Sequence, residues 1–530
     1  MRITYLFISL TVFYCFNLKA QVGSQQASLK IQRTLDIINL FYVDTVNNDK
    51  LAEAAIIEML KTLDPHSTYI SKDEVREMNE PLEGNFEGVG IQFNIFEDTI
   101  LVVNPIPGGP SEKLGIRAGD RIIKIDNVNV AGVKIKNNEV FKKLRGKKGT
   151  TVTVSILRRN EKELLDFTIT RDKIPIYSLD AAYMIDKEIG YIKLNRFAAS
   201  TIEEFKKAIK DLKAKGMKDL ILDLAGNGGG YLNAAVDLAD EFLDDKKMIV
   251  YTQGITSPRT DYKSTANGEL QTGRLVVIVD EGSASASEIV SGAIQDWDRG
   301  IIVGRRTFGK GLVQRPFNLN DGSMIRLTVA RYYTPSGRLI QKPYEKGFDD
   351  YSKEIIKRYN NGELTNADSI HFPDSLKFQT NLSKRTVYGG GGIMPDFFVP
   401  LDTNAYTKYY KQLMQKGIIY RFNLHYLDKE RDKLKEKYKT FDDFKNYFQV
   451  ESSMLDSIAS IAKKEKIEFT DDEKAKSEKD IKNMIKALLA RDIWDNSQYF
   501  EIINPTRDEY MKAIEVLRDK KMYNKKLGKL

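Results

Sequence analysis

Cysteine and histidine are nearly absent from this sequence. Cys15 is the one cysteine in 530 residues, which excludes a disulfide scaffold and a cysteine-ligated zinc site. The three histidines, His66, His371 and His425, lie far apart along the chain and lack the spacing of a metal centre. We therefore expect a protein that works without a bound metal or other cofactor.

A strong excess of charge of one sign is also missing. The chain has 82 basic and 74 acidic residues, a net charge of +8, which over this length does not indicate a nucleic-acid binder. Apolar residues make up 42% and charged residues 29%, so the chain can form ordinary cores and is not disordered. Its length predicts about three to four domains.

The N-terminal apolar run is short for a membrane span. Residues 3–18 are apolar, follow Met1 and Arg2, and end near Lys19-Ala20-Gln21. A membrane-spanning helix needs about 20 such residues, whereas a basic start, an apolar centre and a small residue at the cut resemble a secretory signal peptide. We expect residues 1–20 to direct export to the periplasm, with membrane association if the segment is not cleaved.

Changes in residue pattern divide the rest of the chain into four blocks. Residues 28–80 have apolar residues at helical spacing. Residues 84–172 contain short β-branched runs broken by Gly and Pro. Residues 175–400 alternate apolar strands with amphipathic helices, which predicts an α/β core with mainly parallel strands. Residues 402–530 are Lys-rich and helical, and their lysines are typical of a solvated face.

The glycine-rich loop at residues 223–230 lies between an expected strand and an expected helix. Its glycines allow backbone N–H groups to face a ligand near the positive end of the helix. Such a loop can cradle a phosphate or stabilise an oxyanion. The spacing fails the dinucleotide fingerprint, and no lysine completes a nucleotide P-loop. A tight strand-to-helix turn without a ligand is the other interpretation.

Two further loops carry a serine and a lysine. Residues 280–288 join a strand to a helix and alternate small Ala and Ser residues; a serine there serves either as a helix N-cap or as a nucleophile with open space around it. Residues 307–314 hold Lys310 between two glycines. A lone lysine is usually a solvated charge, but burial would lower its pKa and let a neutral amine take the proton of a serine.

These loops resemble the motifs of the carboxy-terminal processing peptidases, the tail-specific proteases of the S41 family. Ser-Ala-Ser-Ala-Ser-Glu ends three residues after Ser285, and Phe-Gly-Lys-Gly-x-x-Gln surrounds Lys310. The resemblance covers roughly residues 30–400. It implies a multidomain α/β fold: a ClpP/crotonase-like α/β peptidase core with an inserted β-rich PDZ domain and helical N- and C-terminal regions.

The same resemblance implies a catalytic role for four residues. Ser285 would be the nucleophile and Lys310 the general base of a Ser-Lys dyad. Gln314 would orient the lysine, and Asp296 matches an acidic position that supports the site in some relatives.

The resemblance also implies an oxyanion hole formed by backbone amides. Ala286 would supply one amide, and Gly229 the other, with Gly230 as second choice. One departure concerns residue 225, where the family usually has arginine and this chain has Ala225. That change removes a cation but no dyad member.

In the block 84–172, one stretch resembles the carboxylate-binding loop and first strand of a PDZ domain. Its peptide-binding residues would be Gly88, Val89, Gly90, Ile91 and Phe93. A PDZ domain captures a terminal carboxylate with backbone N–H groups while the peptide adds as a strand to the sheet edge. The expected partners are therefore proteins with exposed apolar C-terminal tails, together with an adaptor or a second copy bound through the helical regions, and not nucleic acid.

The resulting hypothesis is an exported serine endopeptidase that cleaves proteins near their C-termini. The alternative is a catalytically silent PDZ-type peptide-binding scaffold, which the loss of the arginine at Ala225 keeps open. A small-ligand-binding or ligase-like protein on the same α/β core is a further rival, and the combination of Ser285, Lys310 and Gln314 argues against it.

Overall fold

The computed structural model describes residues 25–159, 161–403 and 406–529. The predicted signal peptide, residues 1–20 with Cys15, lies outside the described residues. Within the described ranges, none of the helices combines the length and the apolar character needed to cross a bilayer.

A six-stranded sheet forms the centre of the block 175–400. Five of its strands are parallel and one edge strand is antiparallel. The strands lie in the order β10 (Leu179–Met184), β11 (Ile189–Leu194), β12 (Asp219–Asp223), β15 (Leu275–Val279), β16 (Ile301–Gly304) and β21 (Phe397–Phe398). Because β12, β15 and β16 are buried along their whole length, they read as continuous apolar runs and not as alternating patterns.

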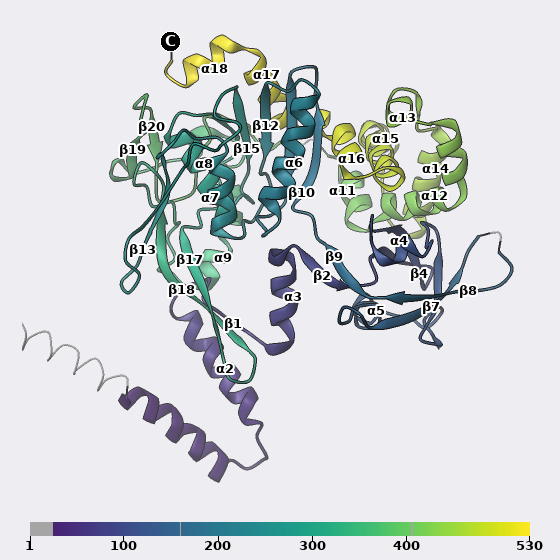
Figure 1. Cartoon of the computed structure of the whole chain (residues 1–530), viewed down its shortest axis with the longest axis horizontal. Coiled ribbons are helices and arrows are strands. Elements are labelled where there is room, and N and C mark those ends of the chain that lie inside the picture. The colour runs from purple at the N-terminus through teal and green to yellow at the C-terminus, as the bar shows by residue number, and fades with distance from the viewer. Residues whose placement is uncertain (1–24, 160, 404–405, 530) are drawn as a thin grey trace, which may run out of the picture.

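Helices cover both faces of this sheet. On one face, alternate residues such as Leu222 and Val277 pack in one core with α6 (Thr201–Ala214), α7 (Leu232–Asp240) and α8 (Ala286–Asp296). On the other face, Ile221 and Val276 pack against α17 (Asp508–Arg518) and α18 (Lys520–Lys526). The last helices of the chain therefore complete the core, although the sequence pattern grouped them with the rest of residues 402–530. Figure 1 shows them beside β12 and β15.

A second sheet joins the N-terminal block to the lysine-carrying part of the core. Its order is β1 (Thr68–Ile70), β18 (Met324–Tyr333), β13 (Met248–Gln253) and β14 (Thr260–Lys263), with β17 (Leu312–Asn318) also paired to β18. Since β1 pairs with β18 antiparallel, with Thr68 opposite Arg326, residues near position 65 reach the site region.

The block 84–172 folds around its own apolar core. Its sheet and helices are β3 (Ile91–Phe96), β4 (Thr99–Pro105), β5 (Arg121–Ile125), β6 (Val128–Asn129), β7 (Thr151–Leu157), β8 (Leu165–Thr170), α4 (Pro110–Lys113) and α5 (Asn137–Leu144). The antiparallel pair β2 (Asn85–Gly88) and β9 (Asp172–Pro175) connects it to the core. Both ends of this domain thus leave side by side, as expected for an inserted domain.

A separate group of helices follows the core. It comprises α11 (Lys408–Gln415), α12 (Ile418–Lys437), α13 (Phe441–Tyr447), α14 (Ser452–Lys464), α15 (Asp471–Ile493) and α16 (Asn496–Ile503), which share one apolar cluster. Leu424 of α12 packs on Phe96 and Leu101 of the β-rich domain, and Arg121 forms a 3.0 Å ion pair with Asp428. Figure 1 shows this group next to β4 and β7. It therefore braces the β-rich domain from outside.

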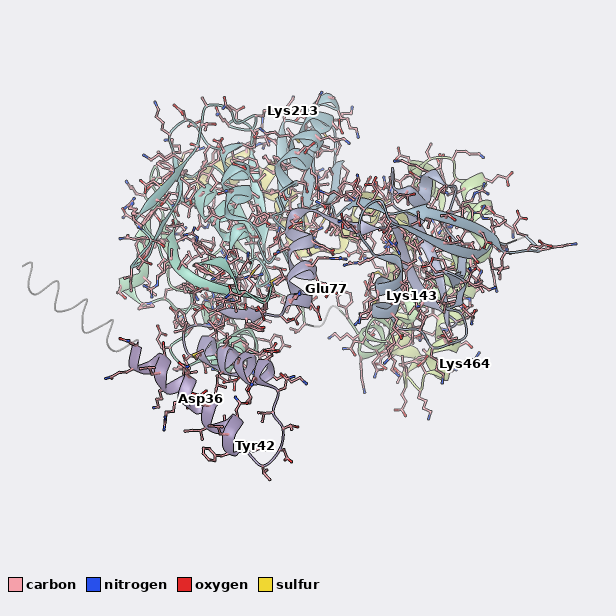
Figure 2. All side chains as sticks on the ribbon, turned by 60° about the horizontal axis from the view of Figure 1, so that its bottom comes forward. Asp36, Tyr42, Glu77, Lys143, Lys213 and Lys464 are labelled. Carbon is pink, nitrogen blue, oxygen red and sulfur yellow. The ribbon has the colours of Figure 1, made fainter. Side chains whose placement is uncertain are left out.

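The N-terminal helix over residues 25–41 is largely exposed. Residues 25–41 are helical, followed by α2 (Asn48–Lys61) and α3 (Lys72–Glu83). Phe41 and Val43 are 78% and 86% exposed. Figure 2 shows Asp36 and Tyr42 on a helical arm that stands away from the body of the molecule.

Candidate active site

Ser285 stands at the turn from β15 into α8, directly before the first residue of the helix. Its backbone has φ +55° and ψ −111°, a region that a non-glycine residue occupies at a cost of about 1–3 kcal/mol. Such strain persists only when the surroundings fix it, and it is concentrated at functional sites. The geometry is that of a nucleophile presented on a sharp strand-to-helix turn.

The glycine loop after β12 packs directly against this serine. A side chain at Gly229 would place its Cβ 2.8 Å from Ser285 Cβ and 3.0 Å from the backbone nitrogen of Ala286. The φ of Gly229 is +100°, which also favours glycine. Contact between two loops at the ends of neighbouring parallel strands is what an oxyanion hole beside a nucleophile requires.

The hydrogen bonds within this loop change the expected choice of donor. The N–H of Gly229 donates to Asn227 Oδ1 at 2.9 Å. The N–H groups of Gly230 and Ala286 have no hydrogen-bond partner among the described residues. The Gly229 N–H is therefore engaged by a buried side chain, whereas the Gly230 N–H is left to bind another group.

Lys310 lies beside Ser285 although 25 residues separate them in sequence. The N–H groups of both residues donate to the same oxygen, Glu288 Oε2, at 2.9 Å from Ser285 and 2.8 Å from Lys310. The hydroxyl of Tyr332 lies between their carbonyl oxygens, 3.1 Å from that of Ser285 and in contact with that of Lys310. Two shared partners thus hold the serine loop and the lysine loop together.

Glu288 is the residue that joins the two loops. It is fully buried, and its other oxygen accepts from the Thr307 hydroxyl and, at 2.7 Å, from the Gly309 N–H. Burial raises the pKa of Glu288 to about 7, against the lowering effect of these hydrogen bonds. Glu288 is absent from the site residues expected from sequence; its place three residues after Ser285, where a capping carboxylate belongs, was the available signal.

The surroundings of Lys310 favour a neutral amine. The pKa of Lys310 is lowered to about 8, mainly by burial and then by Arg326, whereas Glu288 and Asp64 partly oppose the shift. No carboxylate of the described chain forms an ion pair with its amino group. A lysine in this state can accept a proton near neutral pH.

A segment from the N-terminal block also borders the site, which the sequence pattern did not predict. Asp64 is buried and accepts from the N–H and, at 2.6 Å, from the hydroxyl of Ser67. Burial, followed by the charge of Lys310, lowers the pKa of His66 to about 4. His66 is therefore neutral, and its Nε2 lies 2.8 Å from the Tyr351 hydroxyl. This segment reads in sequence only as the end of a helix.

Gln314 lies on β17, opposite Thr328 of β18. Its Nε2 donates to Thr328 Oγ1 at 3.2 Å. No hydrogen bond joins Gln314 to Lys310 in the described chain, so the expected contact between them is not formed in this structure.

Asp296 is not near the dyad. It is the last residue of α8, eleven positions from Ser285, or about 16 Å at 1.5 Å per residue. Its carboxylate is paired with buried Arg338 and accepts from the N–H and hydroxyl of Ser336 at 2.9 and 2.7 Å. These contacts hold the end of the helix, and none of the hydrogen bonds of Asp296 in the described chain joins it to Ser285 or Lys310.

Two cations contact the glycine loop although residue 225 is an alanine and not an arginine. The Nζ of Lys193 donates to the carbonyl of Ala225 at 2.9 Å, and Arg507 lies 2.7 Å from Asp223. Burial alone would raise the pKa of Asp223, but Arg507 and Lys193 outweigh it and hold that pKa well below its usual range. The start of the glycine loop is therefore fixed by an arginine from the C-terminal block.

The residues expected to bind peptide lie at one edge of the β-rich domain. Ile91 and Phe93 are on β3, which ends the sheet order and has a free edge. Their side chains pack with the domain core, and the Phe93 ring lies 5.3 Å from that of Phe141 on α5. Gly88, Val89 and Gly90 precede β3, with Gly90 at φ +74°.

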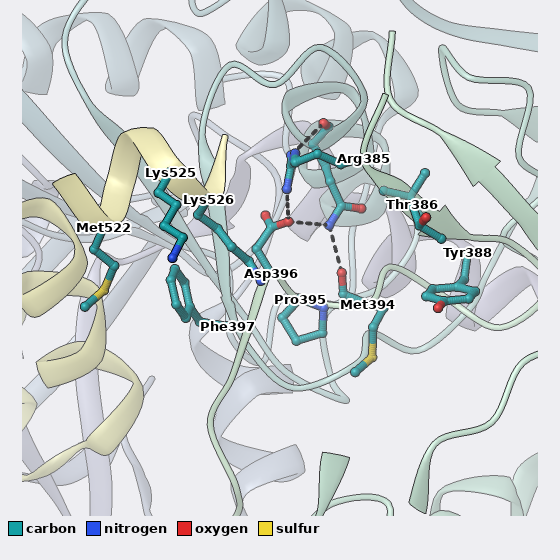
Figure 3. Close-up of a pocket in the computed structure, with 12 residues that line it drawn as sticks. Arg385, Thr386, Tyr388, Met394, Pro395, Asp396, Phe397, Met522, Lys525 and Lys526 are labelled. Carbon is teal, nitrogen blue, oxygen red and sulfur yellow. Dashed lines mark hydrogen bonds and ion pairs between the residues drawn. The ribbon is translucent and has the colours of Figure 1, made fainter. Parts of the chain in front are cut away.

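Two cavities differ in their relation to the site. One of about 860 Å³ is lined by Tyr231, next to the glycine loop, and by Gln314 and Val329. Another of about 480 Å³ lies between Arg385, Asp396 and the helix α18 (Figure 3). In the second, Arg385 is paired with Asp396 and Asp298, so its polar groups are engaged with one another. The first cavity lies between the end of the glycine loop and β17, the strand that carries Gln314.

Four family models match the chain. They are described as peptidase family S41 (residues 188–348), PDZ domain (88–169), activating protease CtpB N-terminal domain (16–74) and a family of unknown function (409–495).

Relatives with known names share the same region. The chain is 36% identical to a probable CtpA-like serine protease of Staphylococcus aureus, over 60% of this chain and 63% of that protein. It is 35% identical to the carboxy-terminal processing protease CtpB of Bacillus subtilis, over 61% and 68%. A solved structure, photosystem II D1 C-terminal processing protease, is 31% identical over 60% and 84%, with a TM-score of 0.35. The match thus spans less than two thirds of the staphylococcal relative.

Proposed function

This chain belongs to the S41 family of serine peptidases, with the carboxy-terminal processing proteases, and from that premise we propose that it is an endopeptidase that cleaves exported proteins near their C-termini. The observation that carries the proposal is the pair of links between Ser285 and Lys310, through Glu288 and Tyr332. These links join the backbones of the two loops, and with the lowered pKa of the Lys310 amine they support a role for Ser285 and Lys310 as a catalytic pair.

In the proposed reaction, the neutral amine of Lys310 takes the proton of the Ser285 hydroxyl as its oxygen attacks the scissile carbonyl. The N–H groups of Ala286 and Gly230 stabilise the resulting oxyanion. The Lys310 ammonium then gives its proton to the leaving amine, and an acyl-enzyme forms. Lys310 next removes a proton from water, which attacks the ester and releases the shortened chain with Ser285 restored.

Substrate selection is assigned to the β-rich domain. A protein tail would add as a strand along the free edge of β3, with its terminal carboxylate at Gly88, Val89 and Gly90 and an apolar side chain towards Phe93. The proposal also assigns a ClpP/crotonase-like fold to the peptidase core. Gln314 would orient Lys310.

The place of action and the partners belong to the same proposal. The apolar run before residue 20 would direct the chain to the periplasm, with membrane association if it is retained. The exposed apolar residues Phe41 and Val43 support an adaptor or second copy docking on the N-terminal arm.

The test is cleavage of a defined tail by the purified protein. A disordered substrate ending in apolar residues is incubated with wild type and with Ser285→Ala, beside a twin substrate with a charged end, and the C-termini are read by mass spectrometry. We expect new C-termini only with wild type and the apolar end. Binding of the tail without cleavage by wild type would instead establish the silent scaffold.

A further inference from the structure

Thr328 connects the N-terminal segment to Gln314. Its hydroxyl donates to Asp64 Oδ1 at 3.0 Å and lies 3.2 Å from Gln314 Nε2. Its backbone N–H donates to the Ser67 hydroxyl at 3.1 Å, which itself donates to Asp64. One carboxylate, 264 positions earlier in the chain, thus fixes both polar groups of Thr328.

The direction of these hydrogen bonds is determined by Asp64. An ionised carboxylate accepts and cannot donate, so Thr328 gives its single hydroxyl proton to Asp64. The Thr328 oxygen can then only accept from Gln314, which requires the Nε2 side of the amide. This leaves Gln314 Oε1 as the group that is available to a second partner.

The orientation of this amide matters to a lysine that acts as a base. If Oε1 faces the amine, it accepts an N–H of Lys310 and leaves the nitrogen lone pair free for the Ser285 proton. If Nε2 faced the amine instead, it would donate to that lone pair and occupy it. Only the first orientation supports proton transfer.

We propose that Asp64 is a positioning residue of the peptidase site, which acts through Thr328 to hold the amide of Gln314 by its Nε2 and so leaves Oε1 free to accept from Lys310 during catalysis. The inference rests on the proposed function and adds to it a residue from outside the core. Asp64 also acts by its charge: the charged groups that face Lys310 are Arg326 on β18, Glu288 on α8 and Asp64, with neutral His66 beside it.

The first experiment separates the hydroxyl from the shape of residue 328. In Thr328→Val, the amide of Gln314 loses the group that fixes its orientation, and we expect kcat to fall by about 10- to 100-fold with KM for the tail unchanged. Thr328→Ser keeps the hydroxyl and should recover most of that loss. Equal kcat values for Thr328→Val and wild type would overturn the relay.

The second experiment removes the charge of Asp64. In Asp64→Asn, the N–H groups of His66 and Ser67 keep Oδ1 in its place, so Thr328 still finds an acceptor. Since the negative charge raises the pKa of Lys310, its loss should move the rising limb of the kcat–pH profile to lower pH. A merely structural role would lower kcat without moving this limb, and an unmoved limb would contradict the proposal.

Asp321 offers a matched control. Like Asp64, it accepts from the N–H and hydroxyl of a nearby serine, here Ser323 at 3.0 and 2.6 Å. Unlike Asp64, it is exposed, on the turn between β17 and β18. Asp321→Asn should leave the pH limb in place. Cleavage by wild type, compared with inactive Ser285→Ala, first tests the proposed function. A wild type that does not cleave refutes that function. An active wild type with Thr328 and Asp64 variants that behave like it refutes only the relay.

Discussion

Two lysines lie on adjacent segments of the site and differ in one respect. The backbone N–H of Lys342 donates to the carbonyl of Gly309, one residue before Lys310. The amino group of Lys342 lies 3.1 Å from Glu354 and 3.9 Å from the centre of the Phe308 ring. Lys310 has Arg326 as its strongest charged neighbour and no ion pair with a described carboxylate.

This difference shows that burial alone does not make a base. Burial lowers the pKa of Lys342 as well, but Glu354 works against it. A salt bridge both stabilises the ammonium and occupies its N–H groups. Lys310 differs because the carboxylate oxygens of its buried neighbour, Glu288, accept hydrogen bonds from backbone N–H groups and not from the lysine amine.

The largest expected effect separates the two lysines directly. Lys310→Met should reduce turnover by about 100-fold or more, because it removes the proposed base for the serine proton. Lys342→Met should cost far less turnover, since that side chain packs on aromatic rings. Single-turnover cleavage of the tail substrate measures both. Comparable losses of turnover for the two variants would contradict the proposed difference in role between Lys310 and Lys342.

The next largest effect is expected at Glu288, which joins the serine loop to the lysine loop. In Glu288→Gln, one of the two acceptor oxygens becomes an NH₂ group, which faces N–H or O–H donors, so the serine and lysine loops should separate. We expect kcat to fall by about 10- to 100-fold while tail binding to the β-rich domain is retained. Steady-state kinetics and a binding titration check this, with Glu281→Gln, a partly exposed carboxylate paired to Arg305, as the control. A lowered affinity with normal kcat would contradict it.

A smaller effect is expected on the pH profile. Activity requires neutral Lys310, so it should rise with pH through a pKa of about 8. Because Arg326 lowers that pKa, Arg326→Leu should raise it and move the rising limb to higher pH. Arg331→Leu, which replaces an exposed arginine on the same strand, should not move it. Profiles of kcat from about pH 5 to about pH 10, which span the titration of a lysine with a lowered pKa, distinguish these outcomes.

The smallest effect is expected from removing the ion-pair partner of Lys342. Glu354→Gln removes the charge partner of Lys342, and since Glu354 is 24% exposed, we expect a loss of about 1 kcal/mol in the free energy of unfolding. Turnover should be nearly unchanged. Urea unfolding measures the loss, with the exposed pair of Glu58 and Lys61 as a reference in which Glu58→Gln has no measurable effect. A large fall in turnover would place Lys342 in the catalytic machinery.

The residues of the proposed site could be found from sequence to the extent that they lie in short local patterns. Ser285 and Lys310 each stand in a compact glycine- or alanine-rich motif, and the alternation of strands and helices predicted the parallel core that carries them. The choice between Gly229 and Gly230 could not be made from sequence, because it depends on one hydrogen bond to Asn227. The pairing of Asp296 could not be read from sequence, because its partner, Arg338, is 42 positions away.

The sequence by itself determined which chemical groups are present and where strands turn into helices. Only the tertiary structure decided which groups meet. Asp64 reaches Thr328 because β1 pairs with β18, and Arg507 reaches Asp223 because the last helices cover the far face of the sheet. The reason is physical: a pKa or a hydrogen-bond direction depends on burial and on neighbours a few ångströms away, which strand pairing and packing set between residues remote in sequence.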